Sequence, residues 1–172
     1  MASLMENLID VLDKEGAEYE KLLRLSAEKT PVIIKGDMEQ LQKITDEEQE
    51  LVSRIANLDK KRAEVTADIA NVLNMDVQTL KLPELISVLE KRPNEQRELA
   101  RVHDRLKEAV QGLRRVNEQN KELLADALEM ISFEMNLLQA TRTAPETANY
   151  NKDAYSLGST MGSGFGGFDA KQ

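Results

Sequence analysis

Two long heptad repeats of apolar residues dominate the pattern along the chain. The first advances in steps of three and four residues, and its apolar members are Leu41, Ile44, Leu51, Ile55, Leu58, Val65, Ile69 and Val72. Glu48 and Arg62 take the two positions that are not apolar. An apolar stripe of this length stays on one face only if the helices supercoil, so it predicts a left-handed coiled-coil seam.

The second repeat lies in the C-terminal half of the chain. Its members are Leu99, Val102, Leu106, Ala109, Leu113, Val116, Asn120, Leu123, Ala127, Met130, Glu134 and Leu137. A helix of this size is on the order of 70 Å long, which predicts a rod. The stretch between the repeats contains Pro83 and Pro93 and is predicted to reverse the chain, with Pro83 in the first turn of a short helix. The two long helices should therefore be antiparallel.

An earlier apolar stripe predicts a first helix that ends at Pro31. Asp37 then follows as the expected cap of the next helix, with Gln40 three residues later. Together the repeats predict an all-α fold, an elongated antiparallel helical hairpin or coiled-coil bundle, over residues 1–142.

The composition changes in residues 143–172, which are rich in glycine and serine. This segment has too little contiguous apolar surface to offset the entropy of ordering its backbone, so we expect a flexible tail. The tail nevertheless contains most of the aromatic side chains of the protein: Tyr150, Tyr155, Phe165 and Phe168. We expect these four residues to bind a partner as the segment becomes ordered.

Charge and composition exclude several classes of function. The formal net charge of −8 leaves no basic face for nucleic acid. Cysteine is absent, and no apolar run is long enough to span a membrane, so we expect a cytoplasmic protein. The single histidine, His103, has no second imidazole or Glu-x-x-His pairing near it. We therefore expect no catalytic activity, no metal or cofactor, and no small-molecule substrate.

The end of the second repeat is the candidate interaction surface. Met130, Phe133, Leu137 and Leu138 either close the helical bundle or bind a helix of a partner protein. Asn120 occupies a seam position and Asn117 lies at its flank, and one buried asparagine in a coiled coil fixes register at some cost in stability. Replacing Asn120 with leucine is therefore expected to stabilise the protein.

Two stretches of sequence resemble the FlgN family of flagellar export chaperones. VNEQNKELLADALEMISFEMNLL resembles the C-terminal signature of that family, and IIKGDMEQLQKITDEEQELVSRIANLDKKR is similar to its second-helix pattern. The ending FDAKQ is similar to that of members from Gram-positive bacteria. The resemblance implies a chaperone of flagellar type III secretion, with client and gate contacts in residues 123–138 and in the tail tyrosines.

Such a chaperone would bind the hook-filament junction proteins FlgK and FlgL and deliver them to the cytosolic domain of the export gate. The alternative is a coiled-coil scaffold or tether with no chaperone role, because heptads alone specify only a helix seam. A scaffold predicts a stable parallel dimer and a chaperone allows a monomeric hairpin. The sequence leaves the oligomeric state open.

Overall fold

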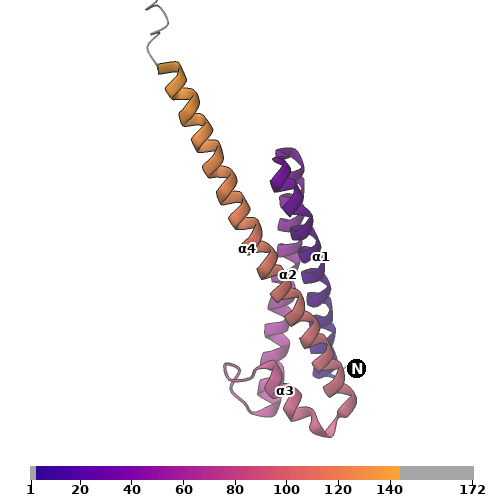
Figure 1. Ribbon diagram of the computed structural model, residues 1–172. Coiled ribbons are helices and arrows are strands. Elements are labelled where there is room, and N and C mark those ends of the chain that lie inside the picture. The colour runs from indigo at the N-terminus through magenta and orange to yellow at the C-terminus, as the bar shows by residue number, and fades with distance from the viewer. Residues whose placement is uncertain (1–2, 144–172) are drawn as a thin grey trace, which may run out of the picture. The chain divides into compact units, whose positions relative to one another are not determined.

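The computed structural model describes residues 3–143, which are helical apart from short connections (Figure 1). The elements are α1 (Leu4–Lys35), α2 (Met38–Leu73), α3 (Leu82–Val88), a 3-10 turn η1 (Leu89–Lys91) and α4 (Pro93–Thr143). This part of the chain contains no strand, so the all-α prediction is confirmed. It falls into two units, one up to Ala127 and the other from Leu128 onward, both of which include part of α4.

Helices α1 and α2 form a hairpin with a very short connection. Gly36 ends α1 in the left-handed conformation at a φ of 68°, which glycine adopts without the steric cost that a Cβ would add. Asp37 follows as the N-cap of α2, and its carboxylate accepts a hydrogen bond from the Gln40 backbone N–H at 3.0 Å. The predicted cap is confirmed.

The prediction that the first helix ends at Pro31 is wrong. Helix α1 continues through this exposed proline to Lys35. Proline removes one backbone donor inside a helix, but the next turn returns Ile33 to the core, where only 7% of it is exposed. The stop signal is Gly36, five residues later than the sequence suggested.

The first part of α4 packs along this hairpin. Its leucines share clusters with both hairpin helices: Leu99 lies in one with Ile69, and Leu113 lies in another with Leu51 and Leu22. Residue numbers therefore increase along α4 in the direction in which they decrease along α2, which confirms the antiparallel arrangement. Helix α1 runs parallel to α4, so the first unit is a three-helix bundle.

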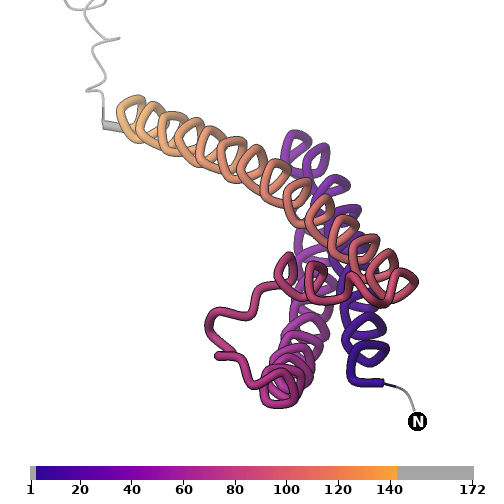
Figure 2. Tube along the Cα trace, turned by 90° about the horizontal axis from the view of Figure 1, so that it is seen from below, coloured from indigo at the N-terminus to yellow at the C-terminus, as the bar shows by residue number. Residues whose placement is uncertain are grey.

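The core of this bundle is almost entirely aliphatic, and the most deeply buried side chains are Leu8, Leu12, Leu85, Leu99 and Val102, each with 0% of its surface exposed. Leu85 comes from α3, which begins with Pro83 in its first turn as predicted. Figure 2 shows α3 and the preceding loop at the end of the bundle where α2 ends and α4 begins. The predicted reversing connector is therefore also a cover for the core.

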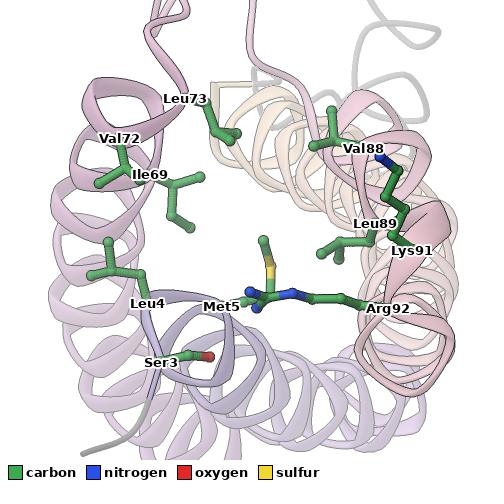
Figure 3. A pocket seen from close by; sticks show the side chains of 10 residues that line it. All are labelled: Ser3, Leu4, Met5, Ile69, Val72, Leu73, Val88, Leu89, Lys91 and Arg92. Carbon is green, nitrogen blue, oxygen red and sulfur yellow. The ribbon is translucent and has the colours of Figure 1, made fainter.

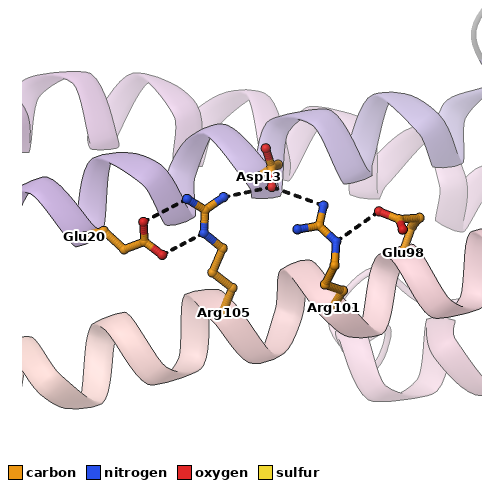
Figure 4. A network of polar contacts seen from close by, with 5 residues as sticks. All are labelled: Asp13, Glu20, Glu98, Arg101 and Arg105. Atoms are coloured by element: carbon orange, nitrogen blue, oxygen red, sulfur yellow. Dashed lines mark hydrogen bonds and ion pairs between the residues drawn. The ribbon is translucent and has the colours of Figure 1, made fainter.

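Polar contacts fix how α1 and α4 pair. The Arg105 guanidinium donates to Glu20 through Nε at 2.7 Å and Nη2 at 2.8 Å, and its Nη1 donates to Asp13 at 3.0 Å. Arg101 reaches the same aspartate at 3.4 Å and Glu98 at 3.1 Å, so the contacts form a chain along the two helices (Figure 4). The hydrogen bonds from Arg105 hold the pKa of the Glu20 carboxyl below its ordinary value.

The two polar positions in the α2 repeat face polar partners on α1. Glu48 accepts hydrogen bonds from the Ser26 hydroxyl at 3.0 Å and from Lys29 at 2.7 Å. Arg62 donates to Glu15 at 3.1 Å, although only 2% of that glutamate is exposed. Both interruptions of the heptad pattern are therefore paired across the hairpin, which gives α1 and α2 one preferred alignment.

Candidate interaction surface

The described part of α4 after Ala127 carries large apolar side chains that nothing covers. They are Leu128, Met130, Ile131, Phe133, Met135, Leu137 and Leu138, each with between 54% and 67% of its surface exposed. Isolated exposed apolar residues are normal on protein surfaces, but a contiguous group of this kind marks an interaction site. This helical segment is the strongest candidate for such a site among the described residues.

The apolar side chains form two stripes on this segment. The 128–138 stripe consists of Leu128, Ile131, Met135 and Leu138, and the 130–137 stripe consists of Met130, Phe133 and Leu137. With 3.6 residues per turn, the centres of the two stripes lie roughly 150° apart around the helix axis. Polar residues separate them, with Ser132 and Asn136 on one side and Glu134 on the other. The segment is therefore apolar on two nearly opposite faces.

Covering these stripes would release substantial free energy. Full burial of one such side chain is worth about 1.5–3 kcal/mol relative to its exposed state. Part of that gain is lost to the entropy of association and of side-chain ordering. Three or four anchors on one stripe still suffice for a specific but reversible complex with an amphipathic helix of a partner.

The four helical residues predicted to bind a partner all lie in this segment. Met130, Phe133 and Leu137 make up one stripe, and Leu138 ends the other. Their exposure is the property that a binding surface requires, whereas side chains that closed the bundle would be buried. Partner binding by these residues stays a prediction.

The sequence analysis did not single out Leu128 and Ile131, which together with Met135 and Leu138 make up the 128–138 stripe. The signal was present, because steps of three, four and three residues are those of a heptad seam. The repeat that begins at Leu99 does not include these positions, because this stripe is displaced from that register by one residue.

The two asparagines differ in their surroundings. Asn120 is buried, with 4% of its surface exposed, and its amide donates to the Ser26 carbonyl oxygen at 2.7 Å while its own oxygen accepts from the Thr30 hydroxyl at 2.6 Å. Its seam position is confirmed. Asn117 is exposed to solvent. A register-setting role therefore has contacts to support it only at Asn120, and for both residues it stays a prediction.

The hydrogen bonds of Asn120 correct the expectation that leucine would stabilise this position. A leucine there would leave the Thr30 hydroxyl without its partner in a part-buried place, and an unsatisfied polar group costs more than a packed methyl group gains. The expected sign of the change is therefore reversed.

The tail aromatics Tyr150, Tyr155, Phe165 and Phe168 lie outside the described residues.

His103 is partly buried next to Asp104, with 3.1 Å between Nδ1 and the carboxylate. Residues 3–143 contain no cluster of histidine and carboxylate side chains suited to a metal ion. Within the same range, no helix is both long and apolar enough to cross a membrane.

Comparison with known proteins decides the family. The model of the FlgN protein family matches residues 1–156, which is most of the chain. The chain belongs to the FlgN family. Membership implies a role as a flagellar export chaperone, a class of protein that binds flagellar substrate proteins and is not enzymatic.

The match to the FlgN family includes all the helices described above and the whole segment with the two stripes. The chain is also similar to the uncharacterized protein YvyG of Bacillus subtilis (strain 168), with 26% identity over 144 residues, 84% of this chain and 83% of that protein. No solved structure matches the chain significantly.

Proposed function

We propose that this protein is a cytoplasmic export chaperone for the hook-filament junction proteins of the FlgK and FlgL type. It binds these clients before secretion and delivers them to the cytosolic domain of the flagellar export gate. The observation that carries the proposal is the exposed segment of α4 between Leu128 and Leu138, which offers a helical client two apolar stripes.

The chemistry of the client explains why such a surface is useful. The ends of junction proteins are expected to be amphipathic and unpaired until assembly, and exposed apolar helices associate with wrong partners. A chaperone helix that covers one apolar face of the client prevents this association. The 130–137 stripe has only three anchors, so its affinity is limited and release at the gate remains possible.

The packing of the bundle favours a chaperone over a coiled-coil scaffold. Both heptad repeats that suggested a scaffold are used inside the chain, where Leu51 and Ile55 of α2 meet Leu113 of α4. A scaffold dimer would need an unoccupied seam, and the apolar members of both repeats before Ala127 are buried or half-buried except Val72. The exposed stripes after that residue are not used in this packing and remain available for association.

Calorimetry with purified junction proteins tests the proposal on the full chain. We expect saturable binding of a FlgK-type or FlgL-type protein by the wild type. The double variant Met130→Ser/Leu137→Ser should bind at least about tenfold more weakly, because two exposed anchors lose their apolar surface. Circular dichroism should show unchanged melting, since both side chains are exposed.

A matched control is Val52→Ser on α2, where 53% of the valine is exposed. This variant removes exposed apolar surface from a different place and should bind clients like the wild type. Equal loss in both variants would indicate nonspecific adhesion. A wild type that forms a stable dimer through α4 and binds no junction protein would support the scaffold and refute the chaperone.

The tail forms the second part of the proposal. Tyr150, Tyr155, Phe165 and Phe168 are separated by residues that favour flexible backbone, so each aromatic side chain can fill a different pocket on a client or on the gate. Helix and tail together would give two moderate contacts in place of one tight contact. Such a division allows the gate to displace one element before the other.

A further inference from the structure

The first unit contains an apolar pocket at the end of the bundle opposite to the Gly36 turn. Its volume is about 430 Å³, and it is lined by the start of α1, the end of α2 and the segment from Val88 at the end of α3 through η1 to Arg92. Figure 3 shows side chains from these three segments around one opening. The volume lies within the range of small ligand pockets and suits one or two large side chains.

The pocket has an apolar floor and an apolar rim. Met5, Ile69 and Leu89 are buried at 9%, 4% and 6% exposure, whereas Val72 and Val88 are exposed at 73% and 46%. An enclosed gap in a core would have no exposed rim of this kind. The graded burial is that of a surface site into which an apolar side chain can insert.

The charged residues of the lining are both cations. Lys91 and Arg92 follow one another at the junction of η1 and α4. Arg92 pairs with Glu95 at 3.2 Å, and its side chain is still 63% exposed, so it can also meet an incoming carboxylate. The start of α1 contributes no free positive charge, because the Ser3 backbone N–H there already donates to the Glu6 carboxylate at 2.7 Å.

This local charge is opposite in sign to that of the whole protein, which has a formal net charge of −8. A basic rim over an apolar floor selects for a ligand that combines an apolar group with a negative charge. Acidic segments are repelled by most of the molecular surface, so attraction at this pocket also confers specificity.

We propose that this pocket binds a segment of a partner protein in which a large apolar side chain lies beside a carboxylate. The apolar side chain inserts among Met5, Ile69 and Leu89, and the carboxylate pairs with Lys91 and Arg92 at the rim. This site belongs to the first unit and uses none of the residues of the two α4 stripes, so it provides a second, independent contact.

The test uses the full chain and three synthetic helical peptides. The first has leucines at helical spacing with a glutamate beside each, the second has glutamine for every glutamate, and the third has serine for every leucine. Methyl NMR of the protein should show shifts at Met5, Ile69 and Leu89 with the first peptide. The second should bind roughly fivefold more weakly, as expected for the loss of exposed ion pairs, and the third should not bind.

Variants of the protein complete the test. Lys91→Glu/Arg92→Glu should remove the preference for the acidic peptide, whereas Lys60→Glu/Lys61→Glu, the same charge change at exposed positions of α2, should leave it unchanged. Val88→Ser should weaken binding of the first peptide without loss of helicity, because the valine is exposed.

Three results would overturn the proposal. One is the absence of methyl shifts with the first peptide, and another is equal affinity for the acidic and neutral peptides. The third is a concentration-dependent dimer that buries the pocket, since a second copy would then be its occupant. Met130→Ser/Leu137→Ser should bind the peptide like the wild type, so failure of the client-binding proposal would leave this site untouched.

Discussion

The two halves of α4 contain the same kinds of side chain in opposite environments. In the first half the seam positions are buried against α1 and α2 with exposures of 8% or less, and they are Leu99, Val102, Leu106, Ala109 and Leu113. Between Leu128 and Leu138 the apolar side chains are more than half exposed. Apolar content alone therefore does not distinguish a core from a binding surface, and the presence of facing helices does.

The number of stripes also differs between the halves. The buried half has one main seam, as a helix on the outside of a bundle requires. The exposed half has two stripes on nearly opposite faces, which is typical of a helix that is covered from both sides.

The largest expected change in stability comes from truncating a side chain in the buried half of α4. Leu99→Ala should lower the free energy of unfolding by about 2–5 kcal/mol, because Leu99 is fully buried and its truncation leaves a cavity in the core. Leu128→Ala should change it by less than about 0.5 kcal/mol. Urea denaturation measures the free energy of unfolding of both variants. Comparable losses would show that Leu128 also packs in a core and would contradict the contrast between the two halves of α4.

The next effect concerns Asn120, which lies between the two halves. Asn120→Leu should destabilise the protein by about 1–3 kcal/mol through the loss of its hydrogen bonds with Ser26 and Thr30. The exposed Asn117 provides the control, and Asn117→Leu should have almost no effect on thermal melting. If Asn120→Leu is instead more stable than the wild type, the buried amide fixes the register of the helices at a cost in stability.

Deleting the residues after Thr143 should separate binding from folding. Helicity and melting are expected to stay nearly unchanged, because the packed core ends before Ala127. Binding to a junction protein or to the export gate should weaken, since the tail aromatics are lost. Circular dichroism and calorimetry on this one variant measure both properties. Full affinity for both partners would assign recognition to the exposed half of α4 alone.

The smallest expected effect is on the pH dependence of stability, and it tests whether burial disfavours the charged form of Glu15. Burial raises the pKa of the Glu15 carboxyl above its usual value, although Arg62 opposes the shift. Between the unfolded and the raised folded pKa, the folded state holds a proton that the unfolded chain has lost, so stability decreases as pH rises through that window. Relative to Glu15→Gln, the wild type should gain stability as the pH falls from neutral towards the ordinary pKa of a glutamate.

Urea titrations of both proteins at several pH values measure this difference. A difference that moves in the opposite direction would show that the ion pair with Arg62 outweighs burial at this site.

Most of the fold could be predicted from the sequence because heptads report directly on helix packing. The spacing that begins at Leu41 and at Leu99 predicted two long helices and their antiparallel pairing, and Pro83 marked the short helix between them. The packing of α1 against α4 could not be predicted in the same way. Its alignment with α4 depends on contacts such as Arg105 with Glu20, which lie 85 residues apart and have no periodic signature.

The candidate site was only partly predictable for a related reason. Periodicity shows that Met130 and Leu137 share a face, but it does not show whether another helix covers that face. Helix α1 ends at Lys35 and α2 begins at Met38, and neither boundary follows from the repeat in α4. The pocket at Met5, Ile69 and Leu89 was not predicted because its walls come from three distant segments.

The short connection at Gly36 has a consequence for synthesis at the ribosome. Helices α1 and α2 are joined by only two residues, so the hairpin can form as soon as both have emerged. Its apolar face, which includes Leu8 and Leu12, must then wait for α4, whose contacts close loops of 85–94 residues. During that interval the nascent chaperone exposes the same kind of adhesive surface that it is proposed to shield on its clients.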